Sequence, residues 1–157
     1  MNELAFCPVD YDPEAPIDEW SGDRGVGSLY FSQQCVFRLA PRAGIGIPAG
    51  LTDAEKLKFV QEKLKAGHPG AGQIWQSMGC YMGYGLAHYA TFYPLKHVLI
   101  LGRCTSGRGG QIILDGANEV LRAEFPDLAH IHIQLPDEKS RRVGQSIAAA
   151  SLPAIRK

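Results

Sequence analysis

The stretch that decides the fold is Gln73–Ser106, which reads QIWQSMGCYMGYGLAHYATFYPLKHVLILGRCTS. Its first part, Gln73–Tyr93, contains no Asp, Glu, Lys or Arg, and its apolar residues fall on every side of a helical period. This pattern predicts a helix that is buried all round. Pro94 disfavours the helical conformation in the residue before it, so the helix should end near Tyr93. The apolar run His97–Leu101 then predicts a short strand covered on both faces, as in a parallel sheet.

Further elements follow that strand in alternating order. A helix with one apolar side is expected from Gln111 to Glu124, and a second strand over Ala129–Leu135. A last helix with a face of small residues is expected over Glu138–Ser151. Strand, helix, strand and helix at this spacing predict a βαβα unit with a right-handed crossover. The expected fold class is therefore helix-rich α/β, with a small sheet flanked by helices.

The sequence before the central stretch is less regular. Residues 1–27 are rich in Pro, Asp and Gly, and their short apolar piece Leu4–Val9 suits an edge strand. Ser28–Ala43 suits a helix that a proline ends. Thr52 with Glu55 three residues later is a capping box, which predicts the start of the clearest helix in the chain.

The composition fits a single domain of 157 residues, with 1–27 as an irregular start and 28–157 as the main lobe. Lys and Arg number 16, as do Asp and Glu, so neither nucleic acid nor an anionic membrane is an expected partner. The acidic N-terminus does not suit a signal peptide, and the long apolar helix is too polar for a membrane span. The cysteines are widely spaced and are expected as free thiols of a cytoplasmic protein: Cys7, Cys35, Cys80 and Cys104.

The best candidate for a site is the loop Gly102–Gly110 after the apolar strand. Ligands of open α/β sheets bind beyond the carboxyl ends of strands, where backbone amides and a helix N-terminus meet anions. The first two glycines have the spacing of a phosphate loop, but Arg108-Gly109 stands where that motif needs Lys-Ser/Thr. A P-loop NTPase is therefore excluded. Two interpretations stay open, a loop that faces a nucleotide or phosphate through Arg103 and Arg108, and a structural turn with solvated arginines.

Other residues could bind a metal or take part in catalysis, but each has a simpler structural interpretation. His130 and His132 lie two apart on the second expected strand and would point to one face, but the sequence offers no third metal ligand nearby. No metal site is therefore expected, and no nucleophile motif is visible. The acidic residues of the N-terminal segment are interpreted as a solvated loop: Asp10, Asp12, Glu14, Asp18, Glu19 and Asp23.

Four stretches, spread in order over nearly the whole chain, resemble one family. Tyr93–Arg103 is similar to an N-P-x-x-I-V-L-G-G strand and loop, and Val143–Ala149 to a G-A-A-like segment of small residues. Tyr30–Ser32 is similar to a Y-x-S helix start, and Glu3–Asp10 to an E-x-G-H-x-P-V-D segment. Together they resemble the C-terminal lobe of ROK-family sugar kinases and repressors, which belong to the actin/hexokinase/Hsp70 ATPase superfamily.

The resemblance implies an actin-like (ribonuclease H-like) lobe which, in an intact kinase, takes part in ATP- and Mg²⁺-dependent phosphoryl transfer to a hexose or hexose derivative. It places Gly102, Arg103, Thr105 and Ser106 at the nucleotide and Glu3 at a sugar hydroxyl. The family's N-terminal lobe, with its phosphate loop and catalytic Asp, has no counterpart here. No catalytic residue is therefore assigned, and the chain alone is expected to be inactive.

Departures from the family pattern favour an alternative. Phe6 replaces a His, Ser28 a sugar-contacting Glu, and Asp18–Gly25 a cysteine-bearing zinc loop, so no zinc is expected. The alternative is a non-catalytic sugar-sensing and dimerisation module of a ROK-like repressor, or a pseudo-kinase. A third interpretation is a lobe that associates with a separately encoded N-terminal half. A homodimer is expected in each case, because the irregular start and the helix Ser28–Leu39 would leave apolar surface uncovered.

Overall fold

The computed structural model describes residues 4–136, so Glu3, the expected helix Glu138–Ser151 and the Val143–Ala149 segment lie outside the described residues. The described part is a mixed, helix-rich fold with 54% helix and a small parallel sheet. Its α-helices are α1 (Ser28–Phe31), α2 (Gln33–Leu39), α3 (Asp53–Lys65), α4 (Pro69–Ala90) and α5 (Arg108–Glu124). Its strands are β1 (His97–Leu99) and β2 (His132–Gln134), and its 3-10 turns are η1 (Leu4–Phe6), η2 (Arg103–Thr105) and η3 (Pro126–Leu128).

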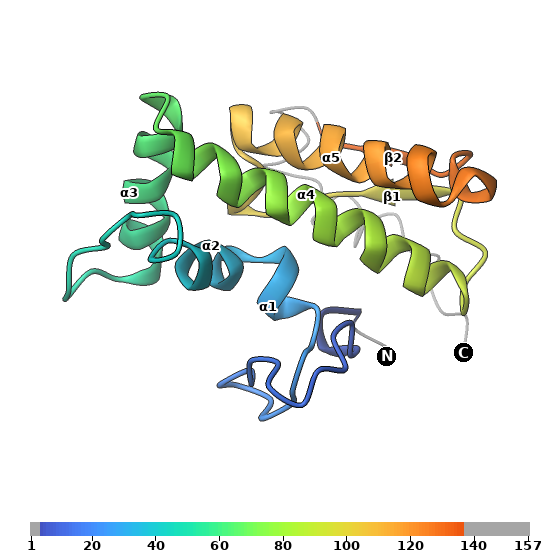
Figure 1. Cartoon of the computed structure of the whole chain (residues 1–157), viewed down its shortest axis with the longest axis horizontal. Helices are drawn as coiled ribbons and strands as arrows, with labels where there is room; N and C mark the ends of the chain where they lie inside the picture. The colour runs from blue at the N-terminus through green and yellow to red at the C-terminus, as the bar shows by residue number, and fades with distance from the viewer. Residues whose placement is uncertain (1–3, 137–157) are drawn as a thin grey trace, which may run out of the picture.

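Helix α4 is the central element, as the charge-free stretch predicts. It runs along the middle of the molecule with α5 beside it, while α1, α2 and α3 lie on its other side (Figure 1). The helix begins four residues before Gln73, because Pro69 occupies its first turn, where a missing N–H group does no harm. It ends at Ala90, ahead of Pro94. Burial is not complete on every side, since Tyr84 is exposed.

Glycines of α4 allow this close packing. The nearest neighbour of Gly79 is the first half of α5, where Gly116 faces it, and a Cβ added at Gly116 would lie 3.1 Å from the Cα of Gly79. One turn on, a Cβ added at Gly83 would lie 2.6 Å from the Cβ of Val120. Because glycine has no side chain, the backbones of α4 and α5 approach closely at these positions.

The expected single helix over Ser28–Ala43 is wrong, because Ser32 divides it into α1 and α2. Ser32 has an extended backbone, and its hydroxyl accepts a hydrogen bond from the N–H of Gln34 at 3.1 Å. The same hydroxyl donates to the Ser28 carbonyl at 2.6 Å. Serine side chains compete in this way with the helical hydrogen bonds, so one residue ends a helix and caps the next.

The capping box at α3 is confirmed. The Thr52 hydroxyl accepts from the N–H of Glu55, and the Glu55 carboxylate accepts from the N–H of Thr52 at 2.8 Å. The Thr52 hydroxyl also donates to the Glu55 carboxylate at 2.7 Å, and this bond, followed by the one from the Thr52 N–H, holds the pKa of Glu55 below its usual range. Gly67, with a φ of +79°, then lets the chain turn into α4.

The sheet is parallel, as expected, but its strands are shorter and less covered than predicted. Its register pairs His97 with His132 and Leu99 with Gln134. The side chains of Leu99 and Leu101 are 55% and 51% exposed. A strand covered on both faces was the wrong expectation, because about half of each of these two side chains is exposed.

The N-terminal segment is not an edge strand. Its apolar piece forms the turn η1, and two isolated antiparallel bridges, Pro8 with Val26 and Ile17 with Arg24, close the segment on itself. Figure 1 places it (blue) beneath α1, away from the sheet. Within the described range, no helix is long and apolar enough to cross a membrane.

Candidate functional site

The loop from Gly102 to Gly107 leaves the end of β1 and leads directly into α5. Its backbone requires glycine at both ends, because Gly102 has a φ of 125° and Gly107 a φ of 60°, which other residues rarely adopt. Between them lies the 3-10 turn η2. The loop therefore sits at the carboxyl end of a parallel strand and at the N-terminus of a 17-residue helix, where open α/β sheets bind ligands.

Three side chains fix the shape of this loop by donating hydrogen bonds to its carbonyl groups. The indole Nε1 of Trp75 donates to the Cys104 carbonyl at 3.0 Å, and the Gln61 amide donates to the Arg103 carbonyl at 2.9 Å. The Thr105 hydroxyl donates to the Gly102 carbonyl at 2.8 Å. Because α3, α4 and η2 each supply one of these donors, the loop is held in one conformation before any ligand arrives.

The residues named from the sequence divide into two groups. Gly102, Arg103 and Ser106 are exposed at the loop surface, together with Arg108 in the first turn of α5. Thr105 is 3% exposed, and its hydroxyl faces the loop backbone rather than solvent. The outer surface of the loop thus carries two guanidinium groups and a hydroxyl, which suits a negatively charged ligand.

Gly109, at the start of α5, explains why the loop lacks the Ser/Thr of a phosphate loop, and Gly110 beside it is equally confined. A Cβ added at Gly109 would lie 2.2 Å from the Trp75 Nε1, and one added at Gly110 would lie 2.3 Å from the Thr105 carbonyl oxygen. The first turn of α5 is thus pressed against the loop. The sequence analysis missed this, although a Gly-Gly pair inside a helix is unfavourable enough to indicate close packing.

Cys104 lies in the middle of the loop but is not suited to nucleophilic chemistry. Its side chain is buried, and burial raises the pKa of the thiol to about 11. Burial also raises the pKa of Cys35 to about 11. A thiol must ionise before it can attack, so both groups are inert at neutral pH. In the described structure none of the four cysteines forms a disulfide, as the sequence predicts.

The acidic N-terminal segment is not simply solvated, as its composition had indicated. Asp18 is buried and accepts hydrogen bonds from the N–H groups of Trp20 and Ser21, at 3.2 and 2.8 Å, and from the Ser28 hydroxyl at 2.9 Å. The N–H of Ser21 contributes most to a lowered pKa of Asp18. This carboxylate therefore shapes the turn that follows it.

Asp10 makes a second such contact, by accepting a hydrogen bond from the Tyr30 hydroxyl. That bond, followed by the N–H of Asp12, holds the pKa of Asp10 below its usual range. Burial, then the bond to Asp10, raises the pKa of Tyr30. The guanidinium of Arg38 lies 4.7 Å from the centre of the Tyr30 ring and also favours the charged form of Asp10.

These shifts predict how stability depends on pH. A carboxyl whose folded pKa is lowered stabilises the fold above its unfolded pKa of about 3.9, and this contribution is lost as the pH falls below it. Tyr30→Phe should therefore lower the free energy of unfolding by about 1 kcal/mol at pH 6, with Asp10 partly exposed. At pH 3 the two proteins should differ much less. Urea unfolding at both pH values measures this, and an undiminished difference at pH 3 would contradict the assignment.

The histidine pair also differs from the expectation. His130 precedes β2, and its Nδ1 lies 2.8 Å from the Asp127 carbonyl oxygen. His132 instead stacks on His97 of the neighbouring strand, with ring centres 5.3 Å apart. Across the described residues, no three His, Cys, Asp or Glu side chains come together as a metal site would require.

The fold and its exposed strand-end loop define a helix-rich α/β lobe with one candidate anion-facing surface. In comparisons with known proteins, the chain matches no protein-family model, and no curated protein is significantly similar to it.

Proposed function

We propose that the chain is the C-terminal lobe of a ROK-like carbohydrate kinase, in which the loop from Gly102 to Ser106 forms one wall of a nucleotide cleft. The observation that carries this proposal is the way the loop is built. The loop follows the carboxyl end of β1, and its carbonyl groups accept hydrogen bonds from Gln61 and Trp75. Its residues Arg103 and Ser106 are exposed to solvent. A preformed loop of this kind loses little conformational entropy when a ligand binds.

The open edge of β1 supports the idea that the second wall comes from elsewhere. Lys96 and Ile100 use their backbone groups toward β2, since His132 donates to the Lys96 carbonyl and Ile100 donates to the Gln134 carbonyl, each at 2.9 Å. His97 and Leu99, which alternate with them along the strand, must then direct their N–H and C=O groups to the opposite edge. No described strand pairs there, and an apolar open edge readily accepts another strand.

A strand added at this edge would end beside the loop, on the side where a nucleotide would lie. In the intact protein, Arg103 would contact the phosphates or stack on the base, while Glu3 would contact a sugar hydroxyl. ATP and Mg²⁺ supply the phosphoryl group and its charge neutralisation. The base that accepts the hydroxyl proton would come from the other lobe, so the lobe alone is proposed to bind nucleotide without transferring phosphate.

One observation favours a non-catalytic module of a ROK-like repressor or a pseudo-kinase instead. The turn around Asp18 is stabilised by hydrogen bonds to a buried carboxylate, in the position where the related kinases carry zinc ligands. The proposed sugar-facing side of this lobe is therefore stabilised by hydrogen bonds in place of zinc ligands. If the chain bound none of the nucleotides tested, this second function would be favoured.

Calorimetric titration of the full chain with Mg²⁺-ATP and with several hexoses tests the proposal. Arg103→Glu should raise the Kd for ATP more than tenfold, because a charge-assisted hydrogen bond of about 1.5–3 kcal/mol is lost and a repulsion gained. Arg42→Glu makes the same change at an exposed position on a different loop and should leave the Kd unchanged.

A coupled assay completes the test. The proposal expects no ATP-dependent phosphorylation of hexoses by the 157-residue chain. Clear turnover would contradict the expectation that the lobe is inactive alone, and equal ATP binding by the two arginine variants would contradict the role of the loop.

A further inference from the structure

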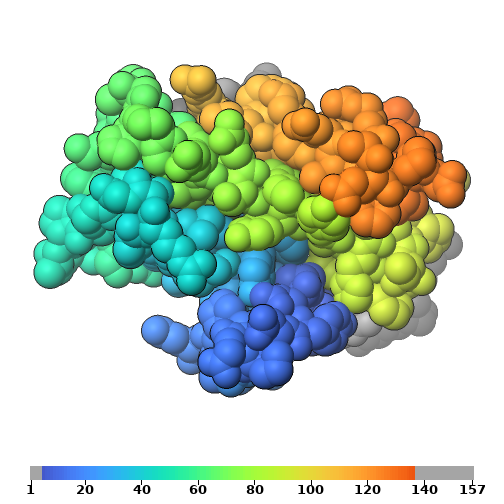
Figure 2. Space-filling model, viewed as in Figure 1, coloured from blue at the N-terminus to red at the C-terminus, as the bar shows by residue number. Residues whose placement is uncertain are grey.

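Helix α3 borders the candidate loop, and one side chain joins the two. The amide of Gln61 donates to the Arg103 carbonyl at 2.9 Å, although the two residues are 42 positions apart in the chain. In Figure 2 the start of α5 (light orange), which follows the loop, lies at the surface near the end of α3 (green). The side of α3 that carries Gln61 is therefore the side that faces the loop.

Two lysines share this side of α3. Lys58 precedes Gln61 by three residues and Lys65 follows it by four. Residues at these spacings lie on one side of an α-helix, with their Cβ atoms about 5–6 Å apart. Both lysine side chains are exposed, whereas Gln61 between them is half-buried. The two lysines therefore lie one turn before and one turn after the hydrogen bond that joins α3 to the loop.

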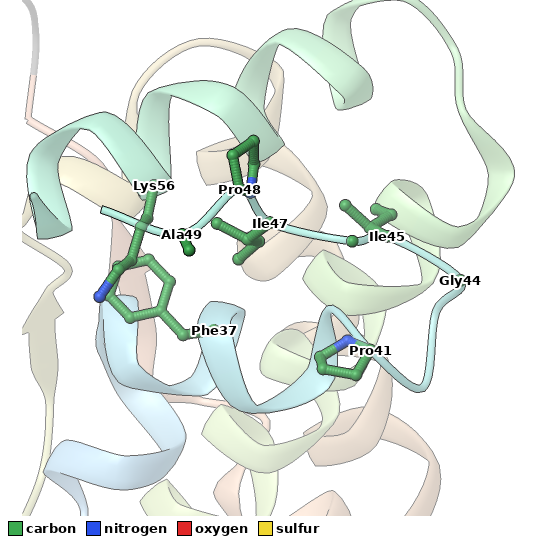
Figure 3. A pocket seen from close by; sticks show the side chains of 9 residues that line it. Phe37, Pro41, Gly44, Ile45, Ile47, Pro48, Ala49 and Lys56 are labelled. Carbon is green, nitrogen blue, oxygen red and sulfur yellow. The ribbon is translucent and has the colours of Figure 1, made fainter. Parts of the chain in front are cut away.

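The other two lysines of α3 lie on the far side of the helix from the loop. Lys56 forms an ion pair with Asp53 at 3.0 Å, and its Nζ lies over the ring of Phe37 in the hollow between α2 and α3 (Figure 3). Lys63 lies over the ring of Phe59, with its Nζ 5.4 Å from the ring centre. These two positions differ from that of Gln61 by more than a quarter turn of the helix, so their charges are directed away from the loop.

The loop side of α3 adds two cations to the two guanidinium groups of the loop. Among residues 4–136, neither Lys58 nor Lys65 forms an ion pair, since the pair of Lys56 with Asp53 is the sole one there. Glu62 is the carboxylate next to them on the helix. Four cations against this one carboxylate leave an excess of positive charge around the loop. Such an excess on one surface attracts anions and favours ligands that carry several negative charges.

We propose that Lys58 and Lys65 extend the anion-facing surface of the loop onto α3, and that this surface takes an oligophosphate, a chain of two or three linked phosphoryl groups. Arg103 and Arg108 can meet a single phosphate, whereas a longer chain carries more charge than two guanidinium groups neutralise. Lysine suits the added positions, because it binds phosphate as a point charge on a flexible stem. The inference rests on the proposed function, since it gives the same loop a ligand with a phosphate chain, and it names two further binding residues outside the loop.

Calorimetric titration of the full chain with inorganic phosphate, pyrophosphate and tripolyphosphate tests the proposal. Affinity should rise with the number of linked phosphoryl groups and fall as salt is added, because exposed charges are screened. Lys58→Gln and Lys65→Gln should each raise the Kd for tripolyphosphate about threefold, and together about tenfold, as expected for contacts between exposed charges. Equal affinities for phosphate and tripolyphosphate would overturn the proposal.

Two control variants separate charge near the loop from charge elsewhere on α3. Lys63→Gln removes the same charge from the far side of the helix and should leave the Kd for tripolyphosphate unchanged. The double variant Lys58→Arg with Lys65→Arg keeps both charges and should bind as the wild type does. If Lys63→Gln weakened binding as much as Lys65→Gln, net charge alone would explain the effect and the assignment to the loop side of α3 would be wrong.

Titration of the same variants with Mg²⁺-ATP separates this inference from the proposed function. If ATP binds but its Kd and that of tripolyphosphate are unchanged in the double glutamine variant, the role of Lys58 and Lys65 is wrong while the nucleotide loop stands. If tripolyphosphate binds through the two lysines but ATP does not bind, the oligophosphate site is supported and the nucleotide function is contradicted. Absence of binding by every phosphate compound would contradict both.

Discussion

Trp75→Ala should lower the free energy of unfolding by about 3–5 kcal/mol, the range measured when large aromatic side chains are removed from protein cores. Trp75 is fully buried in the main core and packs against the first turn of α5 at Gly109. Its removal leaves a cavity at the junction of α4, α5 and the loop. It also leaves the Cys104 carbonyl without the indole donor. A domain of this size is stable by only about 5–15 kcal/mol, so the variant should be close to unfolding.

A second variant separates the packing of Trp75 from its hydrogen bond, and a third serves as a control. Trp75→Phe keeps most of the apolar volume and should lose about 1–3 kcal/mol, mainly because a buried acceptor loses its partner. Tyr11→Ala removes an exposed aromatic side chain and should change the stability by less than about 0.5 kcal/mol. Urea unfolding followed by circular dichroism measures all three. If Trp75→Ala were no less stable than Tyr11→Ala, the central position of this side chain would be wrong.

Gly83→Val should lower the free energy of unfolding by about 3 kcal/mol, the upper part of the range for overpacked cores. The first added carbon would lie 2.6 Å from the Cβ of Val120 and 3.1 Å from the Ala117 carbonyl oxygen. Both neighbours belong to α5, so the two longest helices would have to separate. Because α5 begins at the candidate loop, the same change should also weaken any nucleotide binding by the loop.

A matched substitution and a compensating one make this prediction specific. Gly72→Val, in the same helix, meets open space and should change stability by less than about 0.5 kcal/mol. Val120→Gly removes both carbons of Val120 that Gly83→Val would strike, its Cβ and its Cγ1. The double variant should therefore lose about 1–2 kcal/mol less than the sum of the two single variants, because neighbouring sites are coupled. Thermal unfolding of the four proteins measures this, and strictly additive losses would contradict the close approach of the helices at Gly83.

Local features of the sequence predicted much of the fold. The capping box of Thr52 and Glu55 was recognisable because both partners lie within one turn. The central helix and the strand, helix and strand after it were recognisable from their periodic apolar residues, although their ends shifted by a few residues. The break at Ser32 was missed because a serine hydroxyl can face either solvent or the backbone, and the periodicity of the neighbouring residues is the same in both cases.

The candidate site was predicted less completely than the fold. The position of the loop follows from its place after an apolar strand. The sequence could not separate Arg103 and Ser106, which face solvent, from Thr105, which is turned inward, because the difference comes from hydrogen bonds within the folded loop. The structural role of Asp18 was also missed, since its partner Ser28 lies ten residues away along the chain.

The sequence by itself determined that Gln73–Ser106 would form a long helix, a short strand and a glycine-rich loop, because helix periodicity, proline and glycine act over a few residues. Tertiary structure alone decided what this stretch contacts. The glycines of α4 receive α5, Trp75 holds the loop at Cys104, and within residues 4–136 β1 pairs with a strand on one edge only. These contacts join residues far apart in the chain, and they depend on the complementary shapes of elements that form separately.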